Sequence, residues 1–171
     1  MKIKNITQTA IMAAIICVAA PFSVSVGPIP ISLATFAVYI AGAVLGWEKG
    51  SLAVIIYILL GCIGLPVFSN FEGGFQKIAG VTGGYIIGYI PCAFIIGLIT
   101  YKWNKILSYP VSMVLGTAAC YIVGTAWFMF QTKMSLTAAL LVCVVPFLIG
   151  DAIKIAAASI ISIQIRKRIT I

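Results

Sequence analysis

The chain has 171 residues, of which 63% are hydrophobic and 8% are charged, and its mean hydropathy is +1.20. These values lie outside the range of soluble domains and predict a single integral membrane domain over residues 1–171. The net charge of +8 does not indicate nucleic-acid binding, because the basic residues form no continuous stripe. The chain has no histidine and its five cysteines occur singly, so we expect no metal site and no cofactor.

Six apolar segments predict an all-α bundle of six transmembrane helices. They span residues 6–22, 31–47, 51–68, 81–101, 111–130 and 136–165. The first segment follows Lys2 and Lys4 and resembles a signal peptide, but we expect it to be retained because the later segments need it for a consistent topology. The sixth is too long for one straight crossing, and Pro146 predicts a break with the crossing helix beginning near it.

The basic residues predict the orientation of the bundle. With the N-terminus inside, the outer connections receive only Lys77 and Lys133. The inner side receives Lys2, Lys4, Lys49, Lys102, Lys105, Arg166, Lys167 and Arg168. Because cytoplasmic loops are enriched in lysine and arginine, both termini are expected to face the cytoplasm.

The first segment carries two alanines four residues apart, Ala10 and Ala14, with Ala13 beside them. Small residues at this spacing form a flat stripe that another helix can approach closely. The stripe is consistent with packing inside the bundle and, equally, with contact to another subunit.

Two outer connections are long, residues 23–30 and 68–80, which suggests that a ligand is received on the outer side. After the second connection, Gly80, Gly84 and Gly88 form a small-residue stripe beside Gly83 and Tyr85. The glycines could let the backbone approach a ligand, with Tyr85 offering a flat face and a hydroxyl. Close helix packing is the alternative interpretation of Gly84 and Gly88.

The connection 68–80 alternates polar and aromatic residues, among them Asn70 and three phenylalanines, Phe68, Phe71 and Phe75. This alternation is typical of a lid that closes over a small molecule with its apolar side inward. An interfacial loop with aromatic anchors would have the same composition.

Asp151 and Lys154 are the only ionisable residues deep within an apolar segment. Three positions apart on a helix, they project from one face. Ionisable groups at membrane depth are costly and usually face a cavity, which makes the pair a candidate binding site. A structural ion pair is the alternative, although apolar residues usually stabilise a fold as well as such a pair does. The carboxylate can accept N–H bonds and the ammonium can bind a carbonyl or carboxylate oxygen.

Together these residues resemble the BioY family, the biotin-binding substrate (S) components of energy-coupling factor (ECF) vitamin transporters. The resemblance covers essentially the whole chain. It is carried by the alanine pair and by residues 27–33 (GPIPISL), 80–88 (GVTGGYIIG) and 146–154 (PFLIGDAIK).

The resemblance implies a six-helix S component in a bacterial plasma membrane that captures biotin from outside. It implies that Asp151 and Lys154 recognise the vitamin, with Asn70, Gly83, Gly84 and Tyr85 as further ligand contacts. It also implies that Ala10 and Ala14 dock on a transmembrane coupling subunit linked to a pair of ATPases. The chain itself has no phosphate-binding loop of the P-loop type.

Three alternative functions remain at this stage. The chain could be an S component for another vitamin, or a stand-alone secondary transporter in which Asp151 and Lys154 relay protons. An intramembrane enzyme is disfavoured, because the sequence offers neither a histidine nor a paired-carboxylate site.

Overall fold

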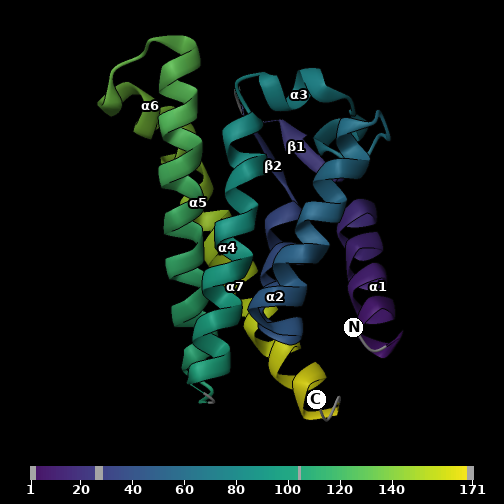
Figure 1. Cartoon of the computed structure of the whole chain (residues 1–171). Helices are drawn as coiled ribbons and strands as arrows, with labels where there is room; N and C mark the ends of the chain where they lie inside the picture. Colours follow the sequence, from purple (N-terminus) through teal and green to yellow (C-terminus); the bar gives the residue numbers. More distant parts are fainter. Residues whose placement is uncertain (1–2, 26–28, 104, 169–171) are drawn as a thin grey trace.

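The computed structural model describes residues 3–25, 29–103 and 105–168, which fold into a helical bundle with a small β-hairpin (Figure 1). Three residues named above lie outside the described residues. They are Lys2, which was counted for the topology, and Gly27 and Pro28, which belong to a family motif. The long helices are α1 (Ile3–Ala19), α2 (Ala34–Cys62), α4 (Gly83–Lys102), α5 (Ser108–Thr132) and α7 (Val145–Arg168). The short elements are β1 (Ser23–Ser25), β2 (Pro30–Ser32), the 3-10 turn η1 (Ser69–Phe71), α3 (Phe75–Ala79) and α6 (Leu136–Cys143).

The helix α2 contains the second and third predicted segments and reverses direction at Gly46. Gly46 has φ +81°, a left-handed conformation that favours glycine. The two halves of α2 then pack on each other, since a Cβ on Gly50 would stand only 2.8 Å from the carbonyl oxygen of Ala41. The predicted third segment is too long, because the helix ends at Cys62 and Gly64 again has a positive φ.

The centre of the bundle is formed by α2, α4 and α5, whose backbones approach closely at small residues. A Cβ on Gly42 of α2 would stand 2.6 Å from the carbonyl oxygen of Ala93 on α4. On the opposite side of α4, a Cβ on Gly88 would stand 3.1 Å from the carbonyl oxygen of Cys120 on α5. Such contacts are how transmembrane helices gain van der Waals packing without a hydrophobic driving force.

The last predicted segment divides where proline predicted a break. Helix α6 ends at Cys143 and α7 begins at Val145, so that Pro146 lies in the first turn of α7. Proline is well tolerated there, because the first turn of a helix has no backbone acceptor for its N–H groups. Asp151 consequently lies in the second turn of α7.

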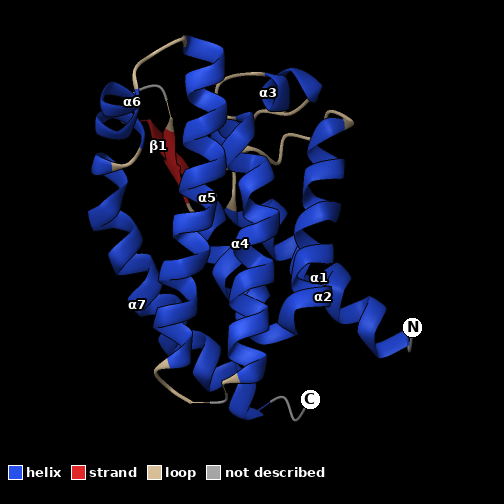
Figure 2. Ribbon diagram, turned by 60° about the vertical axis from the view of Figure 1, so that its left-hand side comes forward, coloured by secondary structure: helices blue, strands red, loops and turns tan. Residues whose placement is uncertain are grey.

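The end of the bundle opposite the termini carries the β-hairpin, α3 and α6 (Figures 1 and 2). The hairpin is antiparallel, with Ser23 opposite Ser32, and was not predicted from the sequence. Of the three loop phenylalanines only Phe68 is buried, while Phe71 and Phe75 are 60% and 69% exposed. The two exposed rings fit an interfacial loop with aromatic anchors, and the lid stays a prediction.

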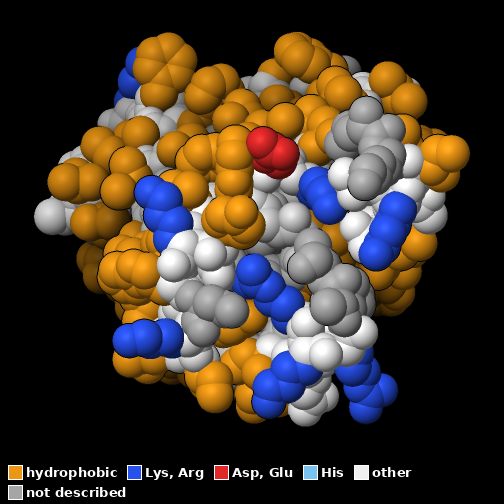
Figure 3. All heavy atoms as spheres, turned by 60° about the horizontal axis from the view of Figure 1, so that its bottom comes forward, with side chains coloured by type: hydrophobic (Ala, Val, Ile, Leu, Met, Phe, Trp, Pro, Cys, Tyr) orange, Lys and Arg blue, Asp and Glu red, His pale blue; other side chains and the backbone are white. Residues whose placement is uncertain are grey.

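Both ends of the described chain lie at the other end of the bundle (Figure 1), and lysine and arginine side chains gather on that face (Figure 3). Four of the described helices, α2, α4, α5 and α7, are long and apolar enough to cross a membrane, while α1 is a shorter apolar helix of 17 residues. The count of six crossing helices and the cytoplasmic location of the termini stay predictions.

Candidate functional site

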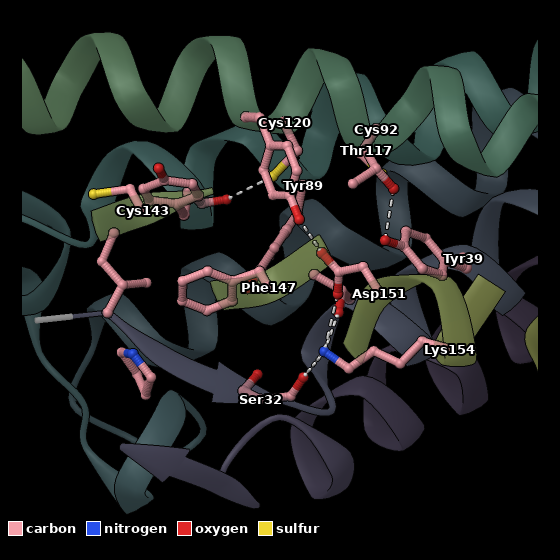
Figure 4. Close-up of a pocket in the computed structure, with 15 residues that line it drawn as sticks. Ser32, Tyr39, Tyr89, Cys92, Thr117, Cys120, Cys143, Phe147, Asp151 and Lys154 are labelled. Atoms are coloured by element: carbon pink, nitrogen blue, oxygen red, sulfur yellow. Dashed lines mark hydrogen bonds and ion pairs between the residues drawn. The ribbon is translucent and has the colours of Figure 1, made fainter. Parts of the chain in front are cut away.

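Two charged side chains of α7 meet inside the bundle. Asp151 is only 5% exposed, and its Oδ1 lies 3.2 Å from the Nζ of Lys154 (Figure 4). The three-residue spacing on one helix turns both side chains to the same face. In the described part of the chain the other ion pair joins Lys77 of α3 to Glu72, whose side chain is 50% exposed. The pair on α7 is thus the one held away from water.

Each member of the pair has partners from other helices or strands. The Lys154 ammonium donates to the backbone oxygen of Ser32 at 2.8 Å and to Oγ1 of Thr35 at 3.0 Å. The hydroxyl of Tyr121, on α5, donates to Oδ2 of Asp151. These bonds offset much of the cost of removing two charges from water. They also tie α7 to α5 and to the junction between β2 and α2.

The pair borders a partly enclosed cavity of about 40 Å³ between α2, α4, α5, α6, α7 and the β-hairpin (Figure 4). Its walls combine aromatic rings, hydroxyl groups and thiols. The lining residues are Ile29, Pro30, Ser32, Thr35, Tyr39, Tyr85, Tyr89, Cys92, Thr117, Cys120, Tyr121, Cys143, Phe147, Asp151 and Lys154. An apolar cavity with a few convergent polar groups is the usual form of a small-molecule site.

Most hydroxyl groups of the cavity wall already have partners. The hydroxyls of Tyr39 and Thr117 lie 2.6 Å apart, and that of Tyr85 lies 3.0 Å from Oγ1 of Thr125. These bonds hold the two tyrosine hydroxyls against α5. The cavity therefore has aromatic walls on α2, α4 and α5, and its ionic groups on α7.

Asn70 lies outside this cavity, at a second and more open cleft of about 530 Å³ on the outer surface. Its φ of +62° turns the η1 segment, and its backbone N–H and side-chain oxygen both contact the hydroxyl of Ser23, at 2.9 and 2.8 Å. Ser32 and Lys154 line both the cavity and the cleft. The two spaces thus adjoin, and Lys154 stands between them.

Of the three residues predicted from the fourth-helix motif, only Tyr85 lines the cavity. A Cβ on Gly83 would collide with the backbone oxygen of Ile78, and one on Gly84 would collide with the side chain of Trp127. Trp127 in turn donates from Nε1 to the carbonyl oxygen of Gly80 at 2.9 Å. The structure places both glycines in close packing against α3 and α5, which is the alternative that the sequence left open.

The two alanines of α1 lie far from the cavity lining. Ala10 and Ala14 are exposed, whereas Ala13 between them is 2% exposed and belongs to the core. The exposed alanines therefore lie on the outer face of α1, where they are available to another helix.

Several cavity residues were missed by sequence reasoning. Tyr39, Thr117 and Tyr121 are hydroxyl-bearing residues in the middle of apolar segments, and nothing beside them in the sequence marks them as cavity residues. Cys92, Cys120 and Cys143, which occur singly in the sequence, are buried free thiols that also line the cavity. A free cysteine behaves as a small apolar residue, so its position in the sequence alone does not separate wall from core.

Comparisons with known proteins agree on one family. The sequence profile of the BioY family matches residues 1–171. The chain is 39% identical to the biotin transporter BioY of Thermotoga maritima, over 96% of both chains. It is 38% identical to the probable biotin transporter BioY of Pyrococcus horikoshii, over 95% of this chain and 96% of that one. Its fold matches the crystal structure of the S-component for biotin from an ECF-type ABC transporter with a TM-score of 0.88 and 29% identity, over 97% and 92% of the two chains.

Proposed function

The chain belongs to the BioY family, and we propose that it captures biotin at the outer side of a bacterial plasma membrane as the S component of an ECF transporter. Family membership and the apolar helices make it a multi-pass membrane protein and a transporter component, not an enzyme. We further propose that a transmembrane coupling subunit and a pair of ATPases complete the transporter.

The buried pair of Asp151 and Lys154 beside an aromatic cavity is the observation that supports biotin as the ligand. Biotin presents a cyclic urea with two N–H donors and a carbonyl oxygen, fused to an apolar ring. The Asp151 carboxylate would accept from the urea N–H groups, and the Lys154 ammonium would donate to an oxygen of the vitamin. The flat faces of Tyr85 and Phe147 would cover the apolar ring.

The size of the cavity implies that part of its wall moves when biotin binds. A volume of about 40 Å³ accommodates only one or two water molecules, far less than a bicyclic vitamin. The β-hairpin is the part of the wall that the bond from Lys154 to Ser32 holds against α7. We infer that biotin competes for Lys154, releases Ser32 and opens the cavity to the outer cleft, where Asn70 would supply a further polar contact. In this proposal Gly83 and Gly84 act indirectly, by setting the position of Tyr85.

The proposed ligand can be tested by calorimetry on the purified, folded chain. We expect saturable heat at micromolar biotin with one site per chain, and no competition from riboflavin or thiamine. An absence of heat with biotin would contradict the proposal. Competition by one of the other vitamins instead would keep the S-component role but change its ligand.

Docking on the coupling subunit is proposed to use the exposed face of Ala10 and Ala14. We expect Ala14→Trp to abolish co-purification with the coupling subunit, because the bulky ring prevents close approach of a second helix. Biotin binding should be unchanged, since α1 does not line the cavity. Ala118→Trp is the matched control, because Ala118 is an exposed alanine on α5. Loss of biotin binding together with normal assembly in the Ala14→Trp variant would contradict this division of roles.

A further inference from the structure

A large basic groove lies at the end of the bundle that carries the termini, opposite the proposed biotin site. Its volume is about 810 Å³, and it is lined by the reversal of α2, the connection between α4 and α5, and the C-terminal end of α7. Figure 3 shows this face, with lysine and arginine side chains around it. Neither the alanine face of α1 nor the biotin cavity contributes to it.

The groove carries an excess of positive charge. Lys49, Lys105, Arg166 and Lys167 line it, together with a single acid, Glu48. Among the described residues none of these five forms an ion pair within the groove. Arg166 donates from one guanidinium nitrogen to the carbonyl oxygen of Thr100 at 3.1 Å. The remaining N–H donors of the guanidinium are available to a ligand. The groove thus presents several donors to an anion.

The rest of the groove wall is apolar and aromatic. Trp47, Tyr101 and Tyr109 line it beside Val44, Leu45, Ile106 and Ile163. Tryptophan and tyrosine concentrate at the level of the lipid headgroups, where one end of the side chain is apolar and the other is wet. A ligand that matches this wall has an anionic group and an apolar part at the same depth in the membrane.

We propose that this groove binds the headgroup of an anionic phospholipid. Its phosphodiester would accept bonds from Arg166 and the lysines, and its glycerol and first acyl carbons would lie against the apolar wall. Basic pockets between transmembrane helices are suited to such headgroups, because the helix ends hold the cations at the depth of the lipid phosphate. A guanidinium can contact a phosphate through two N–H groups, whereas lysine supplies a movable point charge.

Native mass spectrometry of the full chain tests this proposal. The chain is released from detergent after incubation with equal amounts of dioleoyl phosphatidylglycerol and dioleoyl phosphatidylcholine. We expect at least about tenfold preference for one phosphatidylglycerol molecule, and loss of that preference in the variant K105Q/R166Q/K167Q. K4Q/K102Q/R168Q is the matched control, because it removes the same charge from the same end without touching the groove. The control should keep the preference.

Two further measurements separate lipid binding from a loss of folding in the variant and from binding of free phosphate. The milder variant K105Q/K167Q changes only exposed side chains and should lower the preference while the melting temperature is unchanged. Inorganic phosphate at millimolar concentration should not displace the lipid, because it lacks the apolar part. Equal retention of both lipids, an equal loss in the control variant, or displacement by phosphate would overturn the proposal. So would groove variants that keep the lipid but lose the coupling subunit, since the groove would then be a protein contact.

Discussion

Replacing Asp151 with asparagine is expected to weaken biotin binding by about 2–5 kcal/mol, which is roughly a 30-fold to several-thousand-fold rise in Kd. Asparagine keeps the shape of the side chain but loses the negative charge. The variant therefore loses a charge-assisted acceptor for the urea N–H groups and leaves the ammonium of Lys154 without its counter-ion. Calorimetry on the variant, with its melting curve recorded in parallel, measures the effect.

The chain offers a matched control for this charge removal. Glu72 is one of only three acidic residues, and its ion pair with Lys77 lies outside the cavity, with the Glu72 side chain 50% exposed. We expect Glu72→Gln to change the Kd of biotin by less than about 1 kcal/mol, the usual range for an exposed pair. If Asp151→Asn binds biotin as tightly as the control does, Asp151 is a structural residue and the proposed contact is wrong.

Replacing Lys154 with alanine is expected to cost a similar amount, about 2–5 kcal/mol of biotin binding free energy. Among the described residues, the substitution leaves the buried Asp151 carboxylate with the Tyr121 hydroxyl as its one remaining side-chain partner. It also removes the bond to Ser32 that holds the β-hairpin against α7, and the bond to Thr35 of α2. The hairpin should therefore become easier to open, which we expect to raise the association rate of biotin while its dissociation accelerates far more.

Lys77→Ala is the matched control for the second substitution, because it removes a lysine from an ion pair outside the cavity. The double variant D151N/K154A adds a further check. Since the two side chains contact each other, their effects should not be additive, and the double variant should lose less than the sum of the two single losses. Additive losses, or unchanged binding in Lys154→Ala, would show that the two residues do not act on biotin as a unit.

The helices were predicted from the sequence more accurately than the connections between them. Apolar runs of helical length and the basic residues at their ends are local signals, and α4, α5 and α7 follow them closely. The β-hairpin was missed because its pairing of residues 23–25 with 30–32 makes only a short ladder in an outer loop. The predicted segments leave residues 48–50 as the connection between the second and third helices. The reversal occurs earlier, because Gly46 is the residue that adopts the left-handed conformation.

The candidate site was only partly predictable for a physical reason. Asp151 and Lys154 stand out in the sequence because charges are costly in an apolar segment, whatever the fold. The aromatic and hydroxyl walls come from helices far apart in the sequence, as with Tyr39 and Thr117, which are 78 residues apart. Nothing local in the sequence distinguishes a tyrosine that faces the cavity from one that faces lipid. Gly84 was expected at the ligand, but its closest neighbour is Trp127, which only the packing of α4 on α5 reveals.

A structure with bound biotin would test the central proposal most directly, because it shows which groups hold the urea. We predict that a urea N–H lies within hydrogen-bond distance of a carboxylate oxygen of Asp151, and that Lys154 contacts an oxygen of the vitamin and no longer the backbone of Ser32. Biotin bound elsewhere in the chain, with the bonds among Asp151, Lys154 and Ser32 intact, would contradict it.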